Sequence, residues 1–264
     1  MRTRLFVCLT LMSLGLWAEE VRVPSGIDHA PYDALLRKYV DARGRVDYTA
    51  WHASKPDRDT LKAYLLQYAP APGSPAEGKE RIASLLNAYN AFTIDFILDH
   101  FPTESIRKLD DPFTGKRHRA GGRDVSLDEI EHDTLRPLIG WKVHALVVCA
   151  ARSCPPLHHR AYAADTWETT MKHRYRAWLG RKDLNRFLPG KDQVRISKIF
   201  DWYAEDFTDP NGIRDILTRF GPAEHKEFLS KGTYRIRYIE YHWGLNAQSD
   251  LGETYTHSFF KSLF

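Results

Sequence analysis

The sequence predicts an α+β fold that is mostly helical, with a small, predominantly antiparallel sheet and a buried central helix. Residues 82–98 are apolar on nearly every face, which is typical of a helix buried on most sides. Several other stretches repeat apolar residues at helical spacing, whereas only two have the pattern of strands. Helices therefore outnumber strands, and a small sheet packed against them defines the α+β class.

The composition is that of an ordinary folded protein. The chain has 264 residues, of which 43% are hydrophobic and 27% are charged. This length is enough to bury a sizeable core without disulfide bonds. The 38 basic and 34 acidic side chains leave a net charge of +4, which is too small for the usual footprint of a nucleic-acid-binding protein. We therefore expect no nucleic-acid partner.

Residues 1–18 have the pattern of a secretory signal peptide. Two arginines precede the apolar run over residues 5–17, and Ala18 stands before two glutamates. The apolar run is shorter than the roughly 20 residues that a transmembrane helix needs. We expect this segment to be cleaved, the mature chain to have no transmembrane segment, and the protein to be secreted or periplasmic.

Residues 19–78 are predicted to form an N-terminal helical segment with a linker. Apolar residues at helical spacing over residues 32–40 and 60–68 predict two helices. The stretch 70–78 is rich in proline and glycine and indicates a boundary. We expect the main α+β domain to span residues 79–264 and to include a C-terminal strand region.

The predicted central helix carries a polar row. Asn87, Asn90 and Thr93 are spaced by three and therefore share one face of the helix. Because a buried amide without a hydrogen-bond partner costs about 1–3 kcal/mol, these side chains need partners. We expect the two asparagines to hold a neighbouring loop or strand. The alternative is that one of them binds substrate or a developing oxyanion.

A capping box marks the start of the next helix. Ser126 is followed three residues later by Glu129, and Pro137 is expected to end the helix. This helix carries three candidate functional residues, Glu131, His132 and Arg136.

Two strands and three further helices complete the prediction. Residues 143–149 are short, β-branched and apolar on both faces, which predicts a central strand. Residues 233–239 alternate apolar and charged side chains, which predicts a half-buried strand. The additional helices are expected at residues 165–179, 197–207 and 211–220.

Cys149 and Cys154 are the two cysteines that remain after signal-peptide cleavage. They lie at the end of the predicted strand and in the loop that follows, a position where functional side chains are often exposed. In an exported protein the pair is consistent with a structural disulfide, and a reactive thiol is the alternative. Thiol–disulfide exchange is a third interpretation, although the four-residue gap is wider than in the familiar redox motif.

Candidate bases for a reactive thiol are His132, His144, His158 and His159. In a strand, residues 144 and 149 would face opposite sides about 16 Å apart, which disfavours a dyad of His144 with Cys149. The sequence has no histidine, cysteine or carboxylate spacing typical of a metal site. We therefore expect no metal and no cofactor.

Five segments resemble the bacterial family called domain of unknown function 547. They are NAYNAFTI at 87–94, SLDEIEH at 126–132, HALVVCA at 144–150, SCPPL at 153–157 and SKIFDWY at 197–203. The resemblance covers about residues 79–220, with outer markers at 46–48 and 241–246. Relatives tend to have aspartate where this chain has His242, so no acid is expected there. Some eukaryotic members are joined to a glutaredoxin domain, and the resemblance therefore implies thiol chemistry.

Two functional hypotheses follow. The first is an exported thiol-dependent hydrolase or acyltransferase acting on a small molecule or peptide. The second is a non-enzymatic cell-envelope binding or scaffold module with a structural disulfide between Cys149 and Cys154. The first hypothesis assigns the catalytic candidates Cys149, Cys154, His144 and His132, and the oxyanion or substrate-binding candidates Asn87, Asn90, Glu131 and Arg136.

Overall fold

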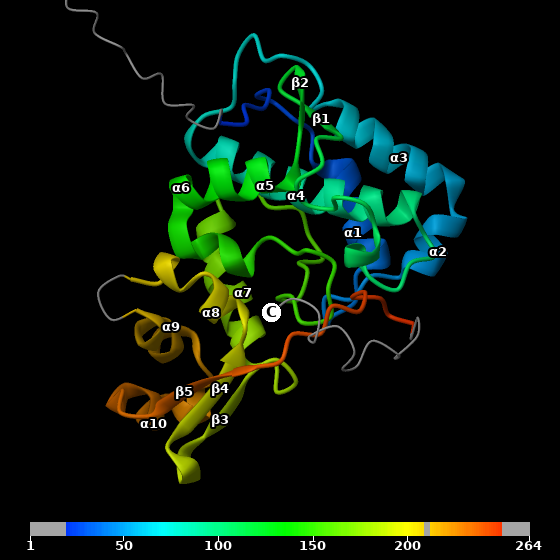
Figure 1. Ribbon diagram of the computed structural model, residues 1–264. Coiled ribbons are helices and arrows are strands. Elements are labelled where there is room, and N and C mark those ends of the chain that lie inside the picture. Colours follow the sequence, from blue (N-terminus) through cyan, green and yellow to red (C-terminus); the bar gives the residue numbers. More distant parts are fainter. Residues whose placement is uncertain (1–19, 209–211, 250–264) are drawn as a thin grey trace, which may run out of the picture.

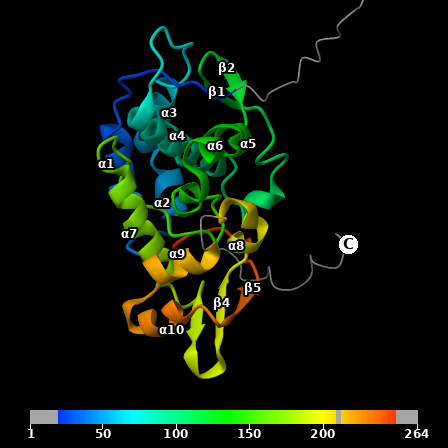
Figure 2. The same cartoon turned by 90° about the vertical axis from the view of Figure 1, so that its left-hand side faces the viewer.

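The computed structural model describes residues 20–208 and 212–249. The expected signal peptide at residues 1–18 lies outside the described residues. Within the described part, no helix has the length and apolar character needed to cross a membrane. The helices α1 to α4 gather at one end of the molecule, and a three-stranded sheet with α9 and α10 forms the other end (Figures 1 and 2).

The N-terminal helices pack around one another and around α4. They are α1 (Ala30–Tyr39), α2 (Tyr48–Ala53) and α3 (Lys55–Leu66), and the first and third confirm the two predicted helices. Aromatic side chains join them, since the rings of Tyr32 and Tyr64 stack 4.9 Å apart. Buried residues on both sides of the stretch 70–78 belong to one hydrophobic core.

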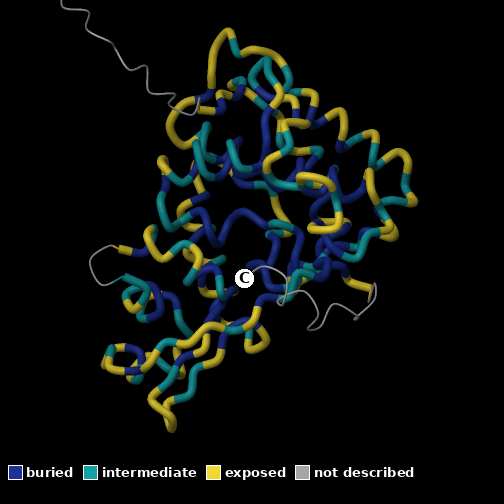
Figure 3. Tube along the Cα trace, viewed as in Figure 1, coloured by how far each residue is buried: buried dark blue, intermediate teal, exposed yellow. Residues whose placement is uncertain are grey.

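The central helix α4 (Gly78–Asp99) confirms the most important prediction. From Ala83 to Leu98 nearly every side chain is buried, and Figure 3 shows the buried residues concentrated in the interior of the molecule. A helix that is apolar on most faces is stable only when other elements cover it all round. Here the N-terminal helices and α5 (Leu127–Ile130) provide that cover.

The capping box starts α5 as predicted, but Pro137 does not end the helix. Ser126 Oγ accepts a hydrogen bond from the Glu129 amide at 3.1 Å, and Glu129 Oε2 accepts one from the Ser126 amide at 2.9 Å. The chain continues through a π-helical turn (Glu131–Leu135) into α6 (Arg136–Ile139). Proline has no amide hydrogen and crowds the carbonyl four residues earlier, and a wider turn relieves this clash.

The predicted central strand at residues 143–149 is wrong. The segment instead begins as a 3₁₀ helix (Gly140–Ala145) and continues as irregular backbone. Its apolar side chains are buried as expected, with Val143 and Leu146 fully covered. Its backbone does not need a neighbouring strand, because the Asn90 side chain bonds both the Leu146 carbonyl and the Val148 amide at 2.9 Å.

The remaining elements confirm the α+β class. A hairpin pairs β1 (His118–Ala120) antiparallel with β2 (Arg123–Val125). In the second sheet β4 (Gln193–Ser197) pairs antiparallel with β3 (Arg186–Leu188) and parallel with β5 (Arg235–Ile239). The sheets are therefore small, one antiparallel and one mixed. The other helices are α7 (Trp167–Leu179), α8 (Ile199–Trp202), α9 (Ile213–Phe220) and α10 (Lys226–Lys231).

Two of these elements differ in detail from the prediction. The single helix expected at 197–207 is a short α8 followed by a 3₁₀ turn (Ala204–Asp206), and Ser197 ends β4. The predicted strand at 233–239 is present as β5, but the face expected to be buried is more open than predicted, with Tyr238 36% exposed.

Candidate thiol site

A tight turn brings the two cysteines together. Ala150, directly after Cys149, has φ +59°, a left-handed conformation that is uncommon for residues other than glycine. The Cys154 amide then donates to the Ala151 carbonyl at 3.1 Å. The turn therefore closes the four-residue gap that separated the two thiols in the sequence.

The C-terminal segment 241–246 holds this turn in place. The amide of Arg152 donates to the Gly244 carbonyl at 2.7 Å, and the amide of Asn246 donates to the Ala150 carbonyl at 2.8 Å. Non-glycine residues with positive φ persist where surrounding contacts over-determine them, and they cluster at functional sites. The unusual backbone at Ala150 is thus supported by a partner segment almost 100 residues away.

The asparagines of α4 position the loops rather than line the site. Asn90 bonds the backbone on either side of Val147, as described above. Asn87 does the same for Tyr162, with its Nδ2 donating to the carbonyl at 2.9 Å and its Oδ1 accepting from the amide at 2.8 Å. Both amides are engaged by backbone groups, and neither asparagine lines the cavity described next.

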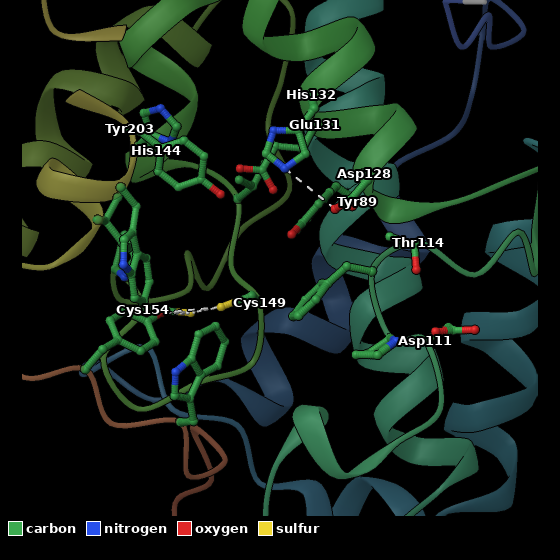
Figure 4. A pocket seen from close by; sticks show the side chains of 18 residues that line it. Tyr89, Asp111, Thr114, Asp128, Glu131, His132, His144, Cys149, Cys154 and Tyr203 are labelled. Carbon is green, nitrogen blue, oxygen red and sulfur yellow. Dashed lines mark hydrogen bonds and ion pairs between the residues drawn. The ribbon is translucent and has the colours of Figure 1, made fainter. Parts of the chain in front are cut away.

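A cavity of about 380 Å³ opens above the two sulfurs. Figure 4 shows side chains from several elements converging on it. They come from α4, the helix with the π turn, the loop that carries the cysteines, α8 and the C-terminal segment. The lining residues used below are Tyr89, Asp111, Phe113, Asp128, Glu131, His132, His144, Cys149, Cys154, Trp202, Tyr203, Tyr241 and Trp243.

The two thiols are close to each other but lie in different environments. Their Sγ atoms are 2.6 Å apart, and both cysteines are free. Cys149 is half-buried at the cavity, whereas Cys154 is buried. The hydroxyl of Tyr241 lies 3.1 Å from the sulfur of Cys154 and 3.4 Å from that of Cys149.

These environments move the two thiol pKa values apart. The hydrogen bond from the Cys154 thiol lowers the pKa of Cys149 against the effect of burial, with help from Tyr241 and the Ala151 backbone. Burial raises the pKa of Cys154 well above its usual value, and the neighbouring Cys149 raises it further. The thiol that faces the cavity is therefore the one that ionises first, and a thiolate is the nucleophilic form of cysteine.

His144 is fixed in a buried charge network. Its side chain is 1% exposed, and its Nε2 lies 2.6 Å from Asp206 Oδ2. Arg136 contacts the same carboxylate through Nε at 2.8 Å and Nη2 at 2.9 Å. Although burial opposes ionisation, the hydrogen bonds from His144 and Arg136 hold the pKa of Asp206 well below its usual value. The ring of His144 stacks on Tyr203 at 4.3 Å.

His132 is more accessible than His144 and lies between two charged partners. Its Nδ1 is 3.0 Å from Arg136 Nη1, and its Nε2 is 3.6 Å from Asp128 Oδ1 (Figure 4). Because a guanidinium only donates hydrogen bonds, Nδ1 must be the acceptor. We therefore assign the proton of a neutral His132 to Nε2, on the side of Asp128.

Glu131 is a buried carboxylate without a cationic partner. It is 7% exposed, and it forms no ion pair with any residue in the described part of the chain. Burial raises the pKa values of the Tyr89 and Tyr203 hydroxyls well above the usual value, and the negative charge of Glu131 raises them further. The π-helical turn (Glu131–Leu135) begins at this residue, and such turns are frequent at functional sites.

The structure brings most of the candidate residues from the sequence to one place. Those that line the cavity are Cys149, Cys154, His144, His132 and Glu131. Arg136 lies behind them and contacts His132 and Asp206, whereas Asn87 and Asn90 hold the surrounding backbone. His158 and His159, also considered as bases, contact each other outside this cavity.

Several residues of the site were missed in the sequence. The sequence patterns single out neither Trp202 nor Tyr203 as a functional candidate, yet both line the cavity. Asp206 gave no signal, because it meets His144 only through the fold. Tyr241 and Trp243 were marked only by the resemblance of residues 241–246. Across the described residues, no group of three or more His, Cys, Asp or Glu side chains is arranged to hold a metal ion.

Residues 74–179 match the model of a family described as "Protein of unknown function, DUF547". This supports the resemblance inferred from the sequence. The matched range contains the two cysteines, the two asparagines of α4 that bond the loop backbone, and the helix with the π turn. Asp206 and Tyr241 lie beyond it. No curated protein and no solved structure matches the chain.

Proposed function

We propose that this protein carries out thiol–disulfide exchange through Cys149 and Cys154 on a small molecule or peptide that enters the cavity. The observation that carries the proposal is the pair of unequal thiols, 2.6 Å apart at the cavity. Cys149 is accessible and has a lowered pKa, whereas Cys154 is buried and has a raised pKa. This is the division of roles between an attacking thiol and a resolving thiol.

The exchange proceeds in two steps. The Cys149 thiolate attacks one sulfur of a substrate disulfide, forms a mixed disulfide with it and releases the other substrate sulfur as a thiolate. Cys154 then attacks Cys149 Sγ, and its proton ends on the departing second substrate thiolate. Two electrons pass from the protein dithiol to the substrate, leaving a disulfide between Cys149 and Cys154. The reverse sequence oxidises a substrate dithiol.

The wide spacing of the cysteines in the sequence does not oppose this proposal. The turn at Ala150 already places the sulfurs beside each other, so ring closure requires only a small displacement. The secretory pattern at residues 1–18 supports, as part of the same proposal, a site of action outside the cytoplasm, where disulfides form and persist.

Acyl transfer is the second candidate function. It is favoured by Glu131, a potential proton acceptor that lines the same cavity as Cys149. A second thiol beside the nucleophile argues against it, because an acyl enzyme needs only one. In an oxidising compartment the neighbouring thiol would trap the nucleophile in a disulfide. We therefore place dithiol exchange first.

The test uses the reduced protein and 4,4′-dithiodipyridine, an uncharged disulfide whose released thiopyridone absorbs light. The wild type should release one thiopyridone in each of the two steps and end as an intramolecular disulfide. Cys154→Ser should release only the first and remain as a mixed disulfide on Cys149, visible by mass spectrometry. Cys149→Ser should react more than about 100-fold more slowly, since its remaining thiol is buried and protonated.

Two results would overturn the proposal. If Cys149→Ser reacts as fast as the wild type, Cys149 is not the attacking thiol. If neither thiol reacts and reduction of the oxidised protein costs about 2–5 kcal/mol of stability, the pair is a structural disulfide. Burst hydrolysis of p-nitrophenyl acetate that survives in Cys154→Ser but not in Cys149→Ser would instead identify acyl transfer.

A further inference from the structure

The charges that line the thiol cavity are of one sign. Asp111, Asp128 and Glu131 line it, and no lysine or arginine of the described residues does. The lining groups with basic character in this part of the chain are His132, whose Nε2 lies 3.6 Å from Asp128, and His144, which is bound to Asp206. A cleft lined by one sign of charge raises the local concentration of ligands of the opposite sign.

Glu131 gives this charge a specific position. Its carboxylate is buried at the cavity next to Tyr89 and Tyr203 and forms no ion pair with the described residues (Figure 4). A buried carboxylate is stable only when hydrogen bonds or an opposite charge compensate for the loss of water. A cationic group of a ligand would provide that charge from the open side of the cavity.

The cavity wall is also rich in aromatic rings. Trp202 and Trp243 stack 5.8 Å apart, and Tyr241 lies 4.7 Å from Trp243. Trp202 is 43% exposed, which is unusual for a large aromatic side chain in this protein. The faces of such rings attract ammonium and guanidinium groups, and Arg107 already lies 4.8 Å over the Trp243 ring.

The basic side chains around the cavity do not cancel its carboxylates. Arg136 is held by Asp206 and by Glu205, the latter at 2.7 Å. Lys116 and Arg123 both pair with Glu129, at 3.2 Å and 2.8 Å. The charges of Arg136, Lys116 and Arg123 are thus matched by carboxylates outside the lining. Arg107, over the Trp243 ring, forms no ion pair with the described residues and offsets part of the negative charge of the cavity, which leaves the remainder available to a ligand.

We infer that the substrate of the thiol site carries a positively charged group, an ammonium or a guanidinium, beside its reacting sulfur. The inference rests on the proposed thiol exchange and names its substrate class. A cysteine flanked by lysine or arginine in a peptide has this chemistry, and so does a small amino disulfide. Anionic disulfides such as oxidised glutathione are poor substrates, because the three lining carboxylates repel them.

The test compares two methanethiosulfonates that differ in charge. The reagents are (2-trimethylammonioethyl) and (2-sulfonatoethyl) methanethiosulfonate, and each transfers its alkylthio group to a thiolate and releases methanesulfinate. For the reduced protein, the reaction rate with the cationic reagent is divided by the rate with the anionic reagent. This ratio is then divided by the same ratio for 2-mercaptoethanol, which corrects for the different intrinsic reactivities of the two reagents. We expect a normalised ratio above about 10 at low salt, falling towards one as salt screens the charges.

Variants locate the preference. Glu131→Gln and Asp128→Asn should each lower the normalised ratio several-fold. The matched control Glu227→Gln removes a carboxylate that is 92% exposed and remote from the lining, and should leave the ratio unchanged. Because Glu131 is buried, its variant is checked by circular dichroism. The half-exposed Asp128 keeps the inference testable if the Glu131 variant does not fold.

The outcomes separate this inference from the proposed function. If Cys149 reacts with both reagents at a normalised ratio near one, the charge preference is refuted while thiol exchange stands. If Cys149 reacts with neither, the proposed function itself fails. Exchange with a Lys-Cys-Lys peptide disulfide or with cystamine should be at least about tenfold faster than exchange with oxidised glutathione. If the peptide disulfide reacts faster than cystamine, the cation belongs to a peptide substrate. If cystamine reacts faster, the cation belongs to a small amine.

Discussion

Two sizeable cavities formed by the described residues lie along α4, and the larger of these two is not the better candidate for a functional site. The thiol cavity measures about 380 Å³ and contacts α4 at Tyr89. The second measures about 440 Å³ and contacts the C-terminal half of α4 at Asp95, Phe96 and Asp99. The difference between them lies in how their charged groups are compensated.

In the second cavity the charged groups make contacts within the fold. Lys62, which lies outside the lining, is 2.9 Å from Asp99 and 3.3 Å from Asp95, so its single positive charge is shared between the two carboxylates of α4. Arg117 donates to the Asp110 carbonyl at 2.9 Å and covers the ring of Phe96. These charges are used within the fold, and such partly exposed pairs add little stability.

In the thiol cavity some ionisable groups also pair, as His132 does with Asp128 and His144 with Asp206. Glu131, however, forms no ion pair with the described residues, and Cys149 has a lowered pKa at an accessible position. A thiol with a perturbed pKa beside a buried carboxylate that lacks an ion pair is a better indication of function than the volume of a cleft. The comparison favours the first cavity over the second as the candidate functional site.

The largest expected effect tests whether the thiol cavity depends on a rigid frame. Asn90→Ala removes a side chain that bonds two backbone groups next to the cysteine loop. We expect a loss of about 2–4 kcal/mol in the free energy of unfolding, because the buried Val148 amide loses its acceptor. We also expect slower alkylation of Cys149, measured with iodoacetamide.

Asn87→Ala is the matched control. It also removes two bonds to backbone, at Tyr162, but on a loop that does not carry a cysteine. A similar loss of stability with a smaller change in alkylation is expected, because Tyr162 reaches the cysteine loop only through its hydroxyl, which donates to the Leu146 carbonyl at 3.0 Å. If both variants slow alkylation equally, the cysteine loop is not specifically positioned by Asn90. The reactivity of Cys149 then does not depend on that pair of hydrogen bonds.

The next effect concerns the histidine of the second cavity. His118 is buried, its Nε2 has no hydrogen-bond partner among the described residues, and burial lowers its pKa from 6.5 to about 4. The unfolded chain therefore binds the proton first as the pH falls, and stability is lost between pH 6.5 and 4. From this one group we expect the free energy of unfolding to be about 2 kcal/mol lower at pH 5 than at pH 8.

His118→Leu removes this group and should reduce the acid-induced loss by that amount, measured by urea unfolding at both pH values. His158, whose pKa is lowered to about 3 by burial, still contributes in the variant, so only the difference between the two proteins is used. An unchanged pH dependence would show that His118 does not titrate as its burial implies.

The smallest effect is expected at the ion pairs of the second cavity. Lys62→Met leaves Asp95 and Asp99 without their cation, yet Lys62 is 46% exposed and its pairs are screened by water. We expect less than about 1 kcal/mol of destabilisation in urea unfolding and no change in the alkylation of Cys149. Slower alkylation of Cys149 in this variant would mean that the two cavities are coupled through α4, contrary to the comparison above.

Local patterns in the sequence were enough to predict the helices that carry the site. The central helix, the capped start of α5 and the helix at 167–179 each follow from apolar spacing or a capping signal. The resemblance in the family motifs and the pair of cysteines also pointed to the right region. These features depend on residues within a few turns of one another, which sequence patterns report well.

The parts that failed depend on contacts between distant residues. The segment 143–149 has the composition of a buried strand, but Asn90 satisfies its backbone and makes a partner strand unnecessary. The argument that separated His144 from Cys149 failed with it, since both line one cavity. Asp206 joins His144 across 62 residues of sequence, and no local pattern reports such a pairing.

The π-helical turn makes the site depend on the length of a helix as well as on its residues. The Arg136 amide bonds the Glu131 carbonyl five residues earlier, whereas an α-helix would bond four residues back. Because each residue of an α-helix turns by about 100°, a deletion within the turn that restored regular α-helix would rotate Glu131 and His132 away from Arg136. The number of residues between Ser126 and Arg136 is therefore itself a determinant of the site. A single substitution does not change this number, whereas a one-residue deletion does.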